Sequence, residues 1–334
     1  MGRRRPTLAS IGEFPFLDRI LDELPPAAGD VRIGPGDDCA VVSGGRGPLL
    51  MTIDALVEGA HFEPGWLRPI EIGRKAYAVN ASDIAAMGGA PRWALVAFHA
   101  PGSFPVADLR AIQRGIVEAA AETGATVVGG NLTSADRLVV TIALIGEAAA
   151  VPIRRAGARA GDEIFVTGTL GDSALGLRML RGELPRRPAV LRRFVRPQPR
   201  LEAGQLLAKH RIASAAIDLS DGLLQDLGHV CDASGVGARI ETDSLPLSSP
   251  YRRIAGDDPA VALSGGEDYE LLFTVSPRNL RRLEQRCRRL PYPITRIGRI
   301  EAEPGIRLDG RRAKVAEGFD HFRAARERGG GSKT

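Results

Sequence analysis

The sequence has few of the residues that cross-link small secreted proteins. It contains only three cysteines in 334 residues, and these are widely spaced: Cys39, Cys231 and Cys287. An odd number of cysteines at this spacing predicts neither a disulfide framework nor a zinc site. We therefore expect reduced thiols, which are typical of cytoplasmic proteins.

The chain also lacks a long apolar run. No stretch is long enough to cross a bilayer. The basic segment 1–7 is not followed by the apolar core of a signal peptide, because Glu13, Asp18 and Arg19 interrupt it. The hydrophobic fraction of 44% and the charged fraction of 25% are those of an ordinary globular chain. We expect a cytoplasmic protein with no membrane partner.

No nucleotide-binding or nucleic-acid-binding signature is present. The sequence contains no Gly-Lys-Ser/Thr of a P-loop and no dinucleotide-binding fingerprint. The formal net charge is +5, but the basic residues are scattered. The densest basic segment, 281–289, has Leu283 and Leu290 at helical spacing and therefore predicts an amphipathic helix with a solvated face. We expect no nucleic-acid partner.

Helical and strand periodicities alternate along the chain in two parts. The first part predicts helices over 72–87 and 106–123, with strands over 39–42, 49–53, 93–98, 126–128 and 138–145. The second part repeats the alternation, with helices over 173–181, 201–209, 223–233 and 279–290 and strands over 163–166, 215–218, 271–275 and 294–300. The fold class is therefore α/β, of the α+β type. The predicted division is a flexible N-terminus over 1–10, domains over 11–148 and 149–325, and a disordered tail over 326–334.

Aspartates fall where an unpaired charge would be costly. They stand at the ends of apolar strands, at a strand-to-helix turn and on a helix whose neighbouring side chains are apolar. These aspartates are Asp37, Asp38, Asp54, Asp83, Asp218 and Asp221. Each alone is also typical of a helix cap or turn. Together they predict one site with a compensating cation. Oxygen ligands without cysteine or clustered histidine favour magnesium or manganese over zinc.

Glycine-rich segments supply the second feature of a phosphate site. Backbone N–H groups can approach an anion where side chains are absent, as is possible at 129–131, 168–173 and 264–268. Singly, each is also typical of an ordinary turn. Two charges 4 Å apart repel by about 4 kcal/mol at an effective dielectric near 20, so joining two phosphate groups calls for several divalent ions. With a phosphate as the acceptor, no general base is needed.

Several longer motifs resemble one family and appear in its order. They are GEF over 12–14, GDDCA over 36–40, DALVEGAHF over 54–62, AVNASDIAAMG over 78–88, VTG over 166–168, GDSA over 171–174, AIDLSDGLL over 216–224, SGGEDYEL over 264–271 and GFDHF over 318–322. On these motifs the chain resembles the thiamine-monophosphate kinases, which have the fold of aminoimidazole ribonucleotide synthetase. The resemblance spans about residues 12 to 322.

This resemblance implies an activity and its partners. The chain would be a phosphotransferase that moves the γ-phosphoryl group of ATP directly onto thiamine monophosphate and gives thiamine diphosphate. Several Mg²⁺ ions would assist, and no side chain would act as nucleophile. The resemblance also implies a homodimer in which the N-terminal domains pair through their sheets. Both substrates would bind in clefts lined by both domains.

The resemblance also implies site residues, by position in its motifs. The metal positions are Asp38, Thr52, Asp54, Asp83, Asn131, Asp218 and Asp221. The ATP positions are Gly130, Asn131, Arg155 and Ser220. The thiamine phosphate positions are His61, Glu267 and Phe319. Phe319 could stack on an aromatic ring. His61 follows Asp54 closely and is expected over the same cleft, although a lone histidine is more often structural.

One departure from the family pattern concerns the metals. The family has Gly-Gly-Asp-Thr-Thr where this chain has Gly-Gly-Asn-Leu-Thr over 129–133. Asn131 offers a neutral oxygen but no negative charge, so we expect weaker magnesium affinity rather than inactivity. The chain also has Thr52 where the family has Ser and Ile53 where it has Thr, and these two departures are milder than the one at Asn131.

Two other functions stay open at this point. The first is a different ATP-dependent enzyme of the same superfamily, such as aminoimidazole ribonucleotide synthetase, selenophosphate synthetase or a hydrogenase-maturation dehydratase. No nucleophilic cysteine motif of the selenophosphate type is visible, and SGGEDYEL favours the thiamine enzyme. The second is a nucleotide-binding or thiamine-diphosphate-binding protein weakened in catalysis. The presence of Asn131 in place of an aspartate suggests this alternative.

Overall fold

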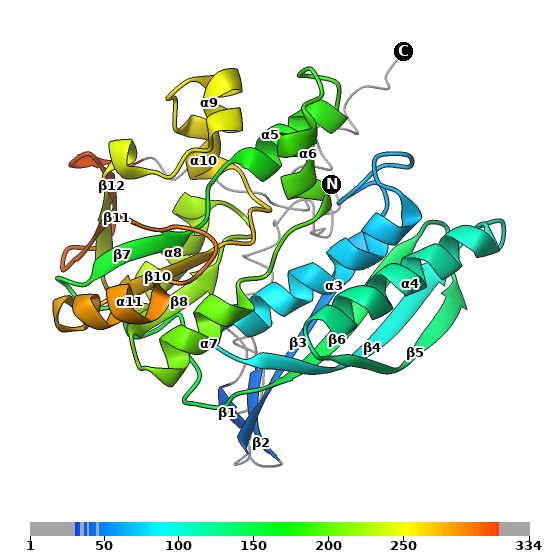
Figure 1. Ribbon diagram of the computed structural model, residues 1–334, viewed down its shortest axis with the longest axis horizontal. Helices are drawn as coiled ribbons and strands as arrows, with labels where there is room; N and C mark the ends of the chain where they lie inside the picture. The colour runs from blue at the N-terminus through cyan, green and yellow to red at the C-terminus, as the bar shows by residue number, and fades with distance from the viewer. Residues whose placement is uncertain (1–30, 34–36, 39, 45–46, 314–334) are drawn as a thin grey trace, which may run out of the picture.

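The computed structural model describes residues 31–313 except 34–36, 39 and 45–46. These residues form two α/β halves, each built on one sheet (Figure 1). This confirms the fold class expected from the sequence. Among the described residues, no helix combines the length and apolarity that crossing a bilayer requires. The predicted division at 10/11, 148/149 and 325/326 stays a prediction.

The first half is a six-stranded sheet in the order β1-β2-β3-β6-β4-β5. Only β4 and β5 pair in parallel; the other neighbours are antiparallel. Its elements are β1 (Val31–Ile33), β2 (Ala40–Gly44), β3 (Gly47–Val57), α3 (Pro69–Ala86), β4 (Ala90–Ala100), α4 (Val106–Glu122), β5 (Thr126–Ser134) and β6 (Val139–Glu147). In Figure 1, α3 and α4 run side by side across one face of this sheet.

Alternating apolar residues give this sheet an inner and an outer face. In β6, Val140, Ile142 and Leu144 are buried and alternate with half-buried neighbours. Because successive strand side chains point to opposite faces, these three face the helices. The inner face of the sheet and the helices above it therefore form one apolar core.

Helix α3 is fixed at both ends and along its length. Pro69 occupies its first turn, where a missing N–H costs nothing, and Gly88 follows its end at a φ of 76°. A Cβ on Gly73 would lie 2.0 Å from the carbonyl oxygen of Ile112, so α3 and α4 are in backbone contact there. The position of every side chain on α3 is therefore set by its neighbours.

The second half is a seven-stranded sheet in the order β13-β12-β9-β11-β7-β10-β8. Its pairs are antiparallel except β9 with β12. Its strands are β7 (Glu163–Thr167), β8 (Ala213–Asp218), β9 (Gly237–Ile240), β10 (Leu271–Val275), β11 (Ile294–Glu301), β12 (Gly305–Leu308) and β13 (Arg311–Arg312). Its α-helices are α5 (Asp172–Leu180), α6 (Pro188–Val195), α7 (Leu201–Lys209), α8 (Leu223–Ser234), α9 (Ser249–Ala255), α10 (Ala260–Ser264) and α11 (Leu280–Cys287), with 3-10 turns η1 (Thr242–Ser244) and η2 (Pro277–Asn279).

The two halves join where α7 packs against the end of α3. A Cβ on Gly204 of α7 would lie 1.9 Å from the carbonyl oxygen of Ala85. Next to this contact, the amide of Ile153 donates to the carbonyl of Met87 over 3.1 Å. Ala85, Leu207 and Phe273 belong to one apolar cluster that spans the junction. The junction thus fixes the last turn of α3 relative to the second half.

Most predicted elements are present, and the differences have physical causes. The segment 129–131, expected as a glycine-rich turn, lies inside β5, where a Cβ on Gly130 would meet the Val96 carbonyl oxygen at 1.9 Å. The absence of a side chain at Gly130 therefore allows the close contact between β5 and β4. The helix expected over 279–290 ends at Cys287 and is preceded by η2. Helix α6 was not predicted, because prolines and arginines surround its few apolar positions. The GEF and GFDHF motifs lie outside the described residues.

Gly204→Ala tests the backbone contact between α7 and α3. The added methyl group has no space at 1.9 Å from a carbonyl oxygen, and overpacking of this kind costs about 1 to 3 kcal/mol. We expect a lower unfolding temperature by differential scanning calorimetry. Gly228→Ala in α8 is the matched control, because a Cβ there meets nothing within 4 Å. Its helix propensity gain is about 0.5 to 1 kcal/mol, so equal destabilisation by both variants would contradict the packing account.

Candidate active site

Three carboxylates converge at the junction of the two halves. Asp38 precedes β2, Asp83 lies near the end of α3, and Asp218 is the last residue of β8. Each offers an oxygen atom within 4.8 Å of those of the other two. The strand-end and helix positions that suggested a shared site in the sequence therefore meet in space.

The cluster has an unfavourable excess of negative charge. Burial raises the pKa of Asp38 to about 7, and it raises the pKa of Asp83 well above its usual range. The charges of Asp218 and Asp38 raise the pKa of Asp83 further. Two groups oppose this: the Arg155 guanidinium pairs with Asp38, and the Thr52 hydroxyl donates to Asp83 Oδ2 over 2.6 Å. One arginine cannot balance three carboxylates.

The residues present fit a divalent cation. Asp38 Oδ2 is buried and has no hydrogen-bond partner, which is costly for a carboxylate oxygen unless a ligand fills its coordination. The donor set consists of oxygens only, as hard divalent cations prefer. Asp38, Asp83 and Asp218 would hold such an ion. Arg155 would keep Asp38 in place through two guanidinium contacts.

Asp54 and Asp221 lie beside this cluster rather than within it. The charge of Asp54 raises the pKa of Asp83, so the two carboxylates are neighbours. Asp221 belongs to a second group, with oxygen or nitrogen atoms of Asp226 and His229 within 4.8 Å. Asp226 also accepts hydrogen bonds from the amides of Asp221 and Gly222 over 3.1 Å. It thus supplies a hydrogen-bond acceptor for backbone N–H groups at the start of α8.

A cavity of about 250 Å³ opens next to the carboxylates. The predicted residues Asp54, His61, Ser220, Asp221 and Glu267 all line it. The Nδ1 atom of His61 accepts a hydrogen bond from the Val57 amide over 3.0 Å. The proton of the neutral His61 ring therefore lies on Nε2. The wall also contains Ser173 and Tyr269 from the predicted motifs, together with three side chains that the sequence did not single out: Leu177, Arg181 and Phe194.

A buried lysine holds Glu267 at this cavity. Lys75 on α3 is only 1% exposed, and its Nζ donates to Glu267 Oε2 over 2.9 Å and to the Phe194 carbonyl over 3.0 Å. The same Nζ lies 3.3 Å from the centre of the Phe194 ring. Burial lowers the pKa of Lys75 and the Glu267 charge opposes the shift. No sequence signal distinguished Lys75 from a lysine on a solvated helix face.

The backbone that carries Glu267 is strained. Glu267 and Tyr269 have φ angles of 66° and 50°, which side chains other than glycine rarely adopt. Their amides donate to the carbonyls of Ser220 and Leu219 over 2.7 and 2.8 Å, and these bonds hold the loop against β8. Strain of this kind is typical of functional sites, because it persists only where surrounding contacts fix the loop.

Two predicted residues lie away from the carboxylates within one chain. Gly130 and Asn131 are exposed on β5, the edge strand, and β6 and β4 separate it from β3. Three strand spacings amount to about 14 Å. Asn131 pairs with Ala97, which places its side chain on the outer face of the sheet, opposite the helices. Phe319 lies outside the described residues.

Comparison with known proteins identifies the family. Residues 36–148 match the family described as AIR synthase related protein, N-terminal domain, and residues 159–311 match its C-terminal domain. The thiamine-monophosphate kinase of Salmonella typhimurium is 40% identical over 327 residues, covering 93% of this chain and 98% of that protein. The one from Aquifex aeolicus is 36% identical, covering 94% and 99%. The chain belongs to the thiamine-monophosphate kinase family. The resemblance read from the motifs is thereby confirmed.

Solved structures agree with this family. A structure described as AaThiL complexed with AMPPCP and TMP superposes with a TM-score of 0.84 at 35% identity, covering 96% of this chain and 100% of that one. The structure of tt0281 from Thermus thermophilus gives 0.83 at 27% identity, covering 92% and 99%. HypE from E. coli, at 23% identity and a TM-score of 0.67, shares the fold.

A divalent cation should stabilise the protein through the three carboxylates. At pH 8 we expect Mg²⁺ to raise the unfolding temperature of metal-free protein, by about 2.7 kcal/mol of stability at a hundred times its dissociation constant. Asp83→Asn removes one of the repelling charges. This variant should unfold at or above the wild-type temperature without metal and gain less from Mg²⁺, as measured by differential scanning fluorimetry. The same gain in wild type and variant would show that the ion binds elsewhere.

Proposed function

We propose that this chain transfers the γ-phosphoryl group of ATP to the phosphate of thiamine monophosphate. The observation that carries the proposal is the buried carboxylate cluster beside a cavity with an anchored glutamate. The cluster suits two phosphate groups brought together by cations, and the cavity suits the rest of the substrate. Support comes from the curated relatives and from a structural neighbour whose description includes AMPPCP and TMP.

The cavity would hold the thiamine part of the substrate. Phe194 and Tyr269 provide aromatic surface, and the Glu267 carboxylate provides a negative charge toward the cationic thiazolium ring. Lys75 would hold Glu267 in one orientation, since its Nζ lies 2.9 Å from the carboxylate. His61 would present its Nε2 proton as a donor. These residues bind and orient the substrate, and none of them need act as a nucleophile.

Magnesium ions would bind at Asp38, Asp83 and Asp218. When bound, they would neutralise the phosphate charges that repel each other during transfer. Thr52 orients the Asp83 carboxylate, and Arg155 orients that of Asp38. With a phosphate oxygen as the acceptor, the protein need not remove a proton. Binding, alignment and charge balance would then account for the catalysis.

A second copy of the chain would cover the outer face of the first sheet. Large apolar side chains on this face are exposed: Met51, Ile53, Trp93 and Leu95. Exposed apolar residues gathered on one sheet face mark an interaction surface. Asn131 and Gly130 adjoin this face, so pairing of two sheets would bring them toward the partner subunit. A homodimer would thus explain why one chain leaves these predicted positions away from its own carboxylates.

A cytoplasmic location stays a prediction from the cysteine content.

Turnover of purified protein tests the proposal directly. With ATP, Mg²⁺ and thiamine monophosphate we expect thiamine diphosphate, measured by liquid chromatography. Asp218→Asn should reduce kcat by at least about a hundredfold, the scale seen when a charge that stabilises the transition state is lost. Asp243→Asn, on η1 and outside the cavity lining, is a control expected to leave the rate unchanged. Binding of both substrates without product would instead favour the protein weakened in catalysis.

Asn131→Asp tests the departure from the family motif. A carboxylate at this position adds a negative charge, and a full charge binds a divalent cation better than an amide oxygen does. We expect half-maximal activity at a Mg²⁺ concentration about tenfold lower, which corresponds to about 1.4 kcal/mol. Gln285→Glu, exposed on α11, changes the net charge equally and serves as control. An unaltered magnesium dependence in Asn131→Asp would refute a role for residue 131 in metal binding.

A further inference from the structure

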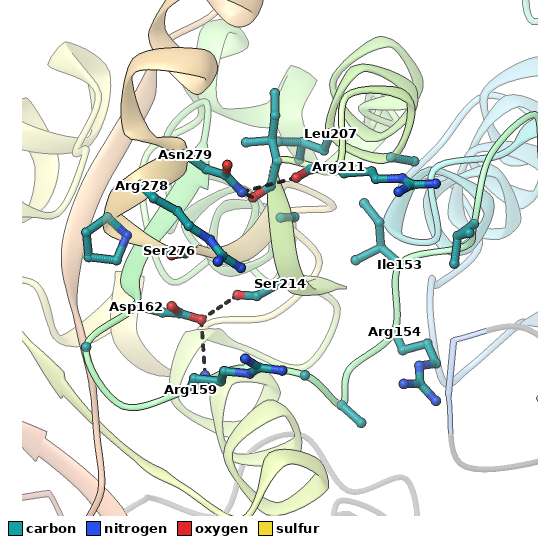
Figure 2. A pocket seen from close by; sticks show the side chains of 18 of the residues that line it. Ile153, Arg154, Arg159, Asp162, Leu207, Arg211, Ser214, Ser276, Arg278 and Asn279 are labelled. Carbon is teal, nitrogen blue, oxygen red and sulfur yellow. Dashed lines mark hydrogen bonds between the residues drawn. The ribbon is translucent and has the colours of Figure 1, made fainter.

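A second cavity, of about 820 Å³, lies on the second half of the molecule (Figure 2). Its wall consists of the linker over 151–162, the end of α7, the start of β8 and the loop from β10 to η2. Its lining includes none of the residues predicted for the active site. The cavity therefore needs an explanation of its own.

Four arginines line this cavity: Arg154, Arg159, Arg211 and Arg278. All four are exposed. Figure 2 shows Arg278 extending over the middle of the cavity and Arg159 along its opposite side, while Arg154 and Arg211 stand at the rim. We call this site the arginine pocket. Guanidinium groups around one space repel each other unless an anion lies between them.

Among the described residues that line the pocket, the single acidic one is already engaged. Asp162 is 4% exposed, and its Oδ2 accepts the Ser214 hydroxyl over 2.6 Å and the Arg159 amide over 3.1 Å. These two bonds fix the backbone of the pocket floor. Asp162 can offset one of the four positive charges, so the pocket keeps a positive excess.

The arginines of the pocket differ from others in the chain. Arg74, Arg200 and Arg296 each pair with carboxylates at hydrogen-bond distance. Within the described residues, Arg159 and Arg278 have no carboxylate within 4.0 Å. Arg154 and Arg211 also have no carboxylate of the described residues within 4.0 Å. The charges of Arg159, Arg211 and Arg278 are thus available to a ligand, while that of Arg154 also acts on Asp37.

The backbone around the pocket is held in place by side chains. The Asn279 amide donates to the carbonyls of Arg211 and Ile212 over 3.1 and 3.2 Å. Arg211 has a φ of 49°, a strained value that these bonds help to maintain. On the other side, Asp162 holds the Arg159 amide. The guanidinium groups therefore project from fixed backbone rather than from free loops.

We propose that the arginine pocket binds a small anion that carries two or more linked phosphate groups. Guanidinium groups match phosphate oxygens with paired hydrogen bonds, which ammonium groups do not. Four of them around 820 Å³ exceed what one phosphate can contact. Val151 in the pocket lining is 71% exposed and offers apolar surface to an organic group on the anion. Both an inorganic oligophosphate and a nucleoside diphosphate have this chemistry.

Calorimetric titration with inorganic tripolyphosphate tests the proposal. The full chain is titrated in EDTA, so that no divalent ion can carry the probe to the three carboxylates. We expect Arg159→Ala/Arg278→Ala to weaken binding by about tenfold or more, because two charge-assisted contacts are lost. Arg186→Ala/Arg253→Ala is the matched control: it removes two exposed arginines elsewhere and the same net charge. It should change the affinity by less than about twofold.

A single variant and a second probe make the outcome decisive. Arg278→Ala alone, on the exposed turn η2, repeats the test if the double variant does not fold, and it should weaken binding by about threefold or more. ADP is titrated in the same way: tighter binding than tripolyphosphate with the same arginine dependence assigns the pocket to a nucleotide, and weaker binding assigns it to an oligophosphate. The proposal is overturned if neither probe binds, or if the pocket variants and the control lose equal affinity.

Discussion

Repulsion among three carboxylates at the junction of the two halves is the constraint on which the rest of this structure depends. Asp38, Asp83 and Asp218 come from different elements, and their oxygens lie within 4.8 Å of one another. Such an arrangement is unfavourable by itself, since burial and like charge both oppose ionisation. It persists because strongly packed elements impose it. The molecule thus uses stability gained elsewhere to hold a site that attracts cations.

The packing that imposes this arrangement is concentrated along α3. Glycines bring it into backbone contact with α4 on one side and with α7 on the other. The contact with α7 joins the two halves, so the helix that carries Asp83 is also the main structural link between the sheets. A change at Gly73 or Gly204 would therefore act on the site without touching it.

The sequence predicted much of this fold and part of the site, for identifiable reasons. Long periodic segments such as α3, α7 and β10 were predictable because tertiary packing agrees with their local pattern. Helix α6 was not, because prolines and arginines surround its few apolar positions and the contact of Phe194 with Lys75 is visible only in the folded chain. The site positions Asp38, Asp83 and Asp218 came from motifs, and their mutual distance is a tertiary property. Asn131 shows the limit most clearly: its motif implied a metal position, but strand order sets its distance from the carboxylates of the same chain, and its pairing with Ala97 sets the face it occupies.

The spacing of Lys75 and Asp83 has a consequence for what the protein can accept. Both residues stand on α3, eight positions apart, which corresponds to about 12 Å of helix rise. In the proposed function, Lys75 anchors the glutamate beside the organic part of the substrate, and Asp83 would hold the cation that binds its phosphate. A single rigid helix therefore works as a gauge of molecular length. A compound with the right charged groups but a shorter or longer body could satisfy only one end at a time.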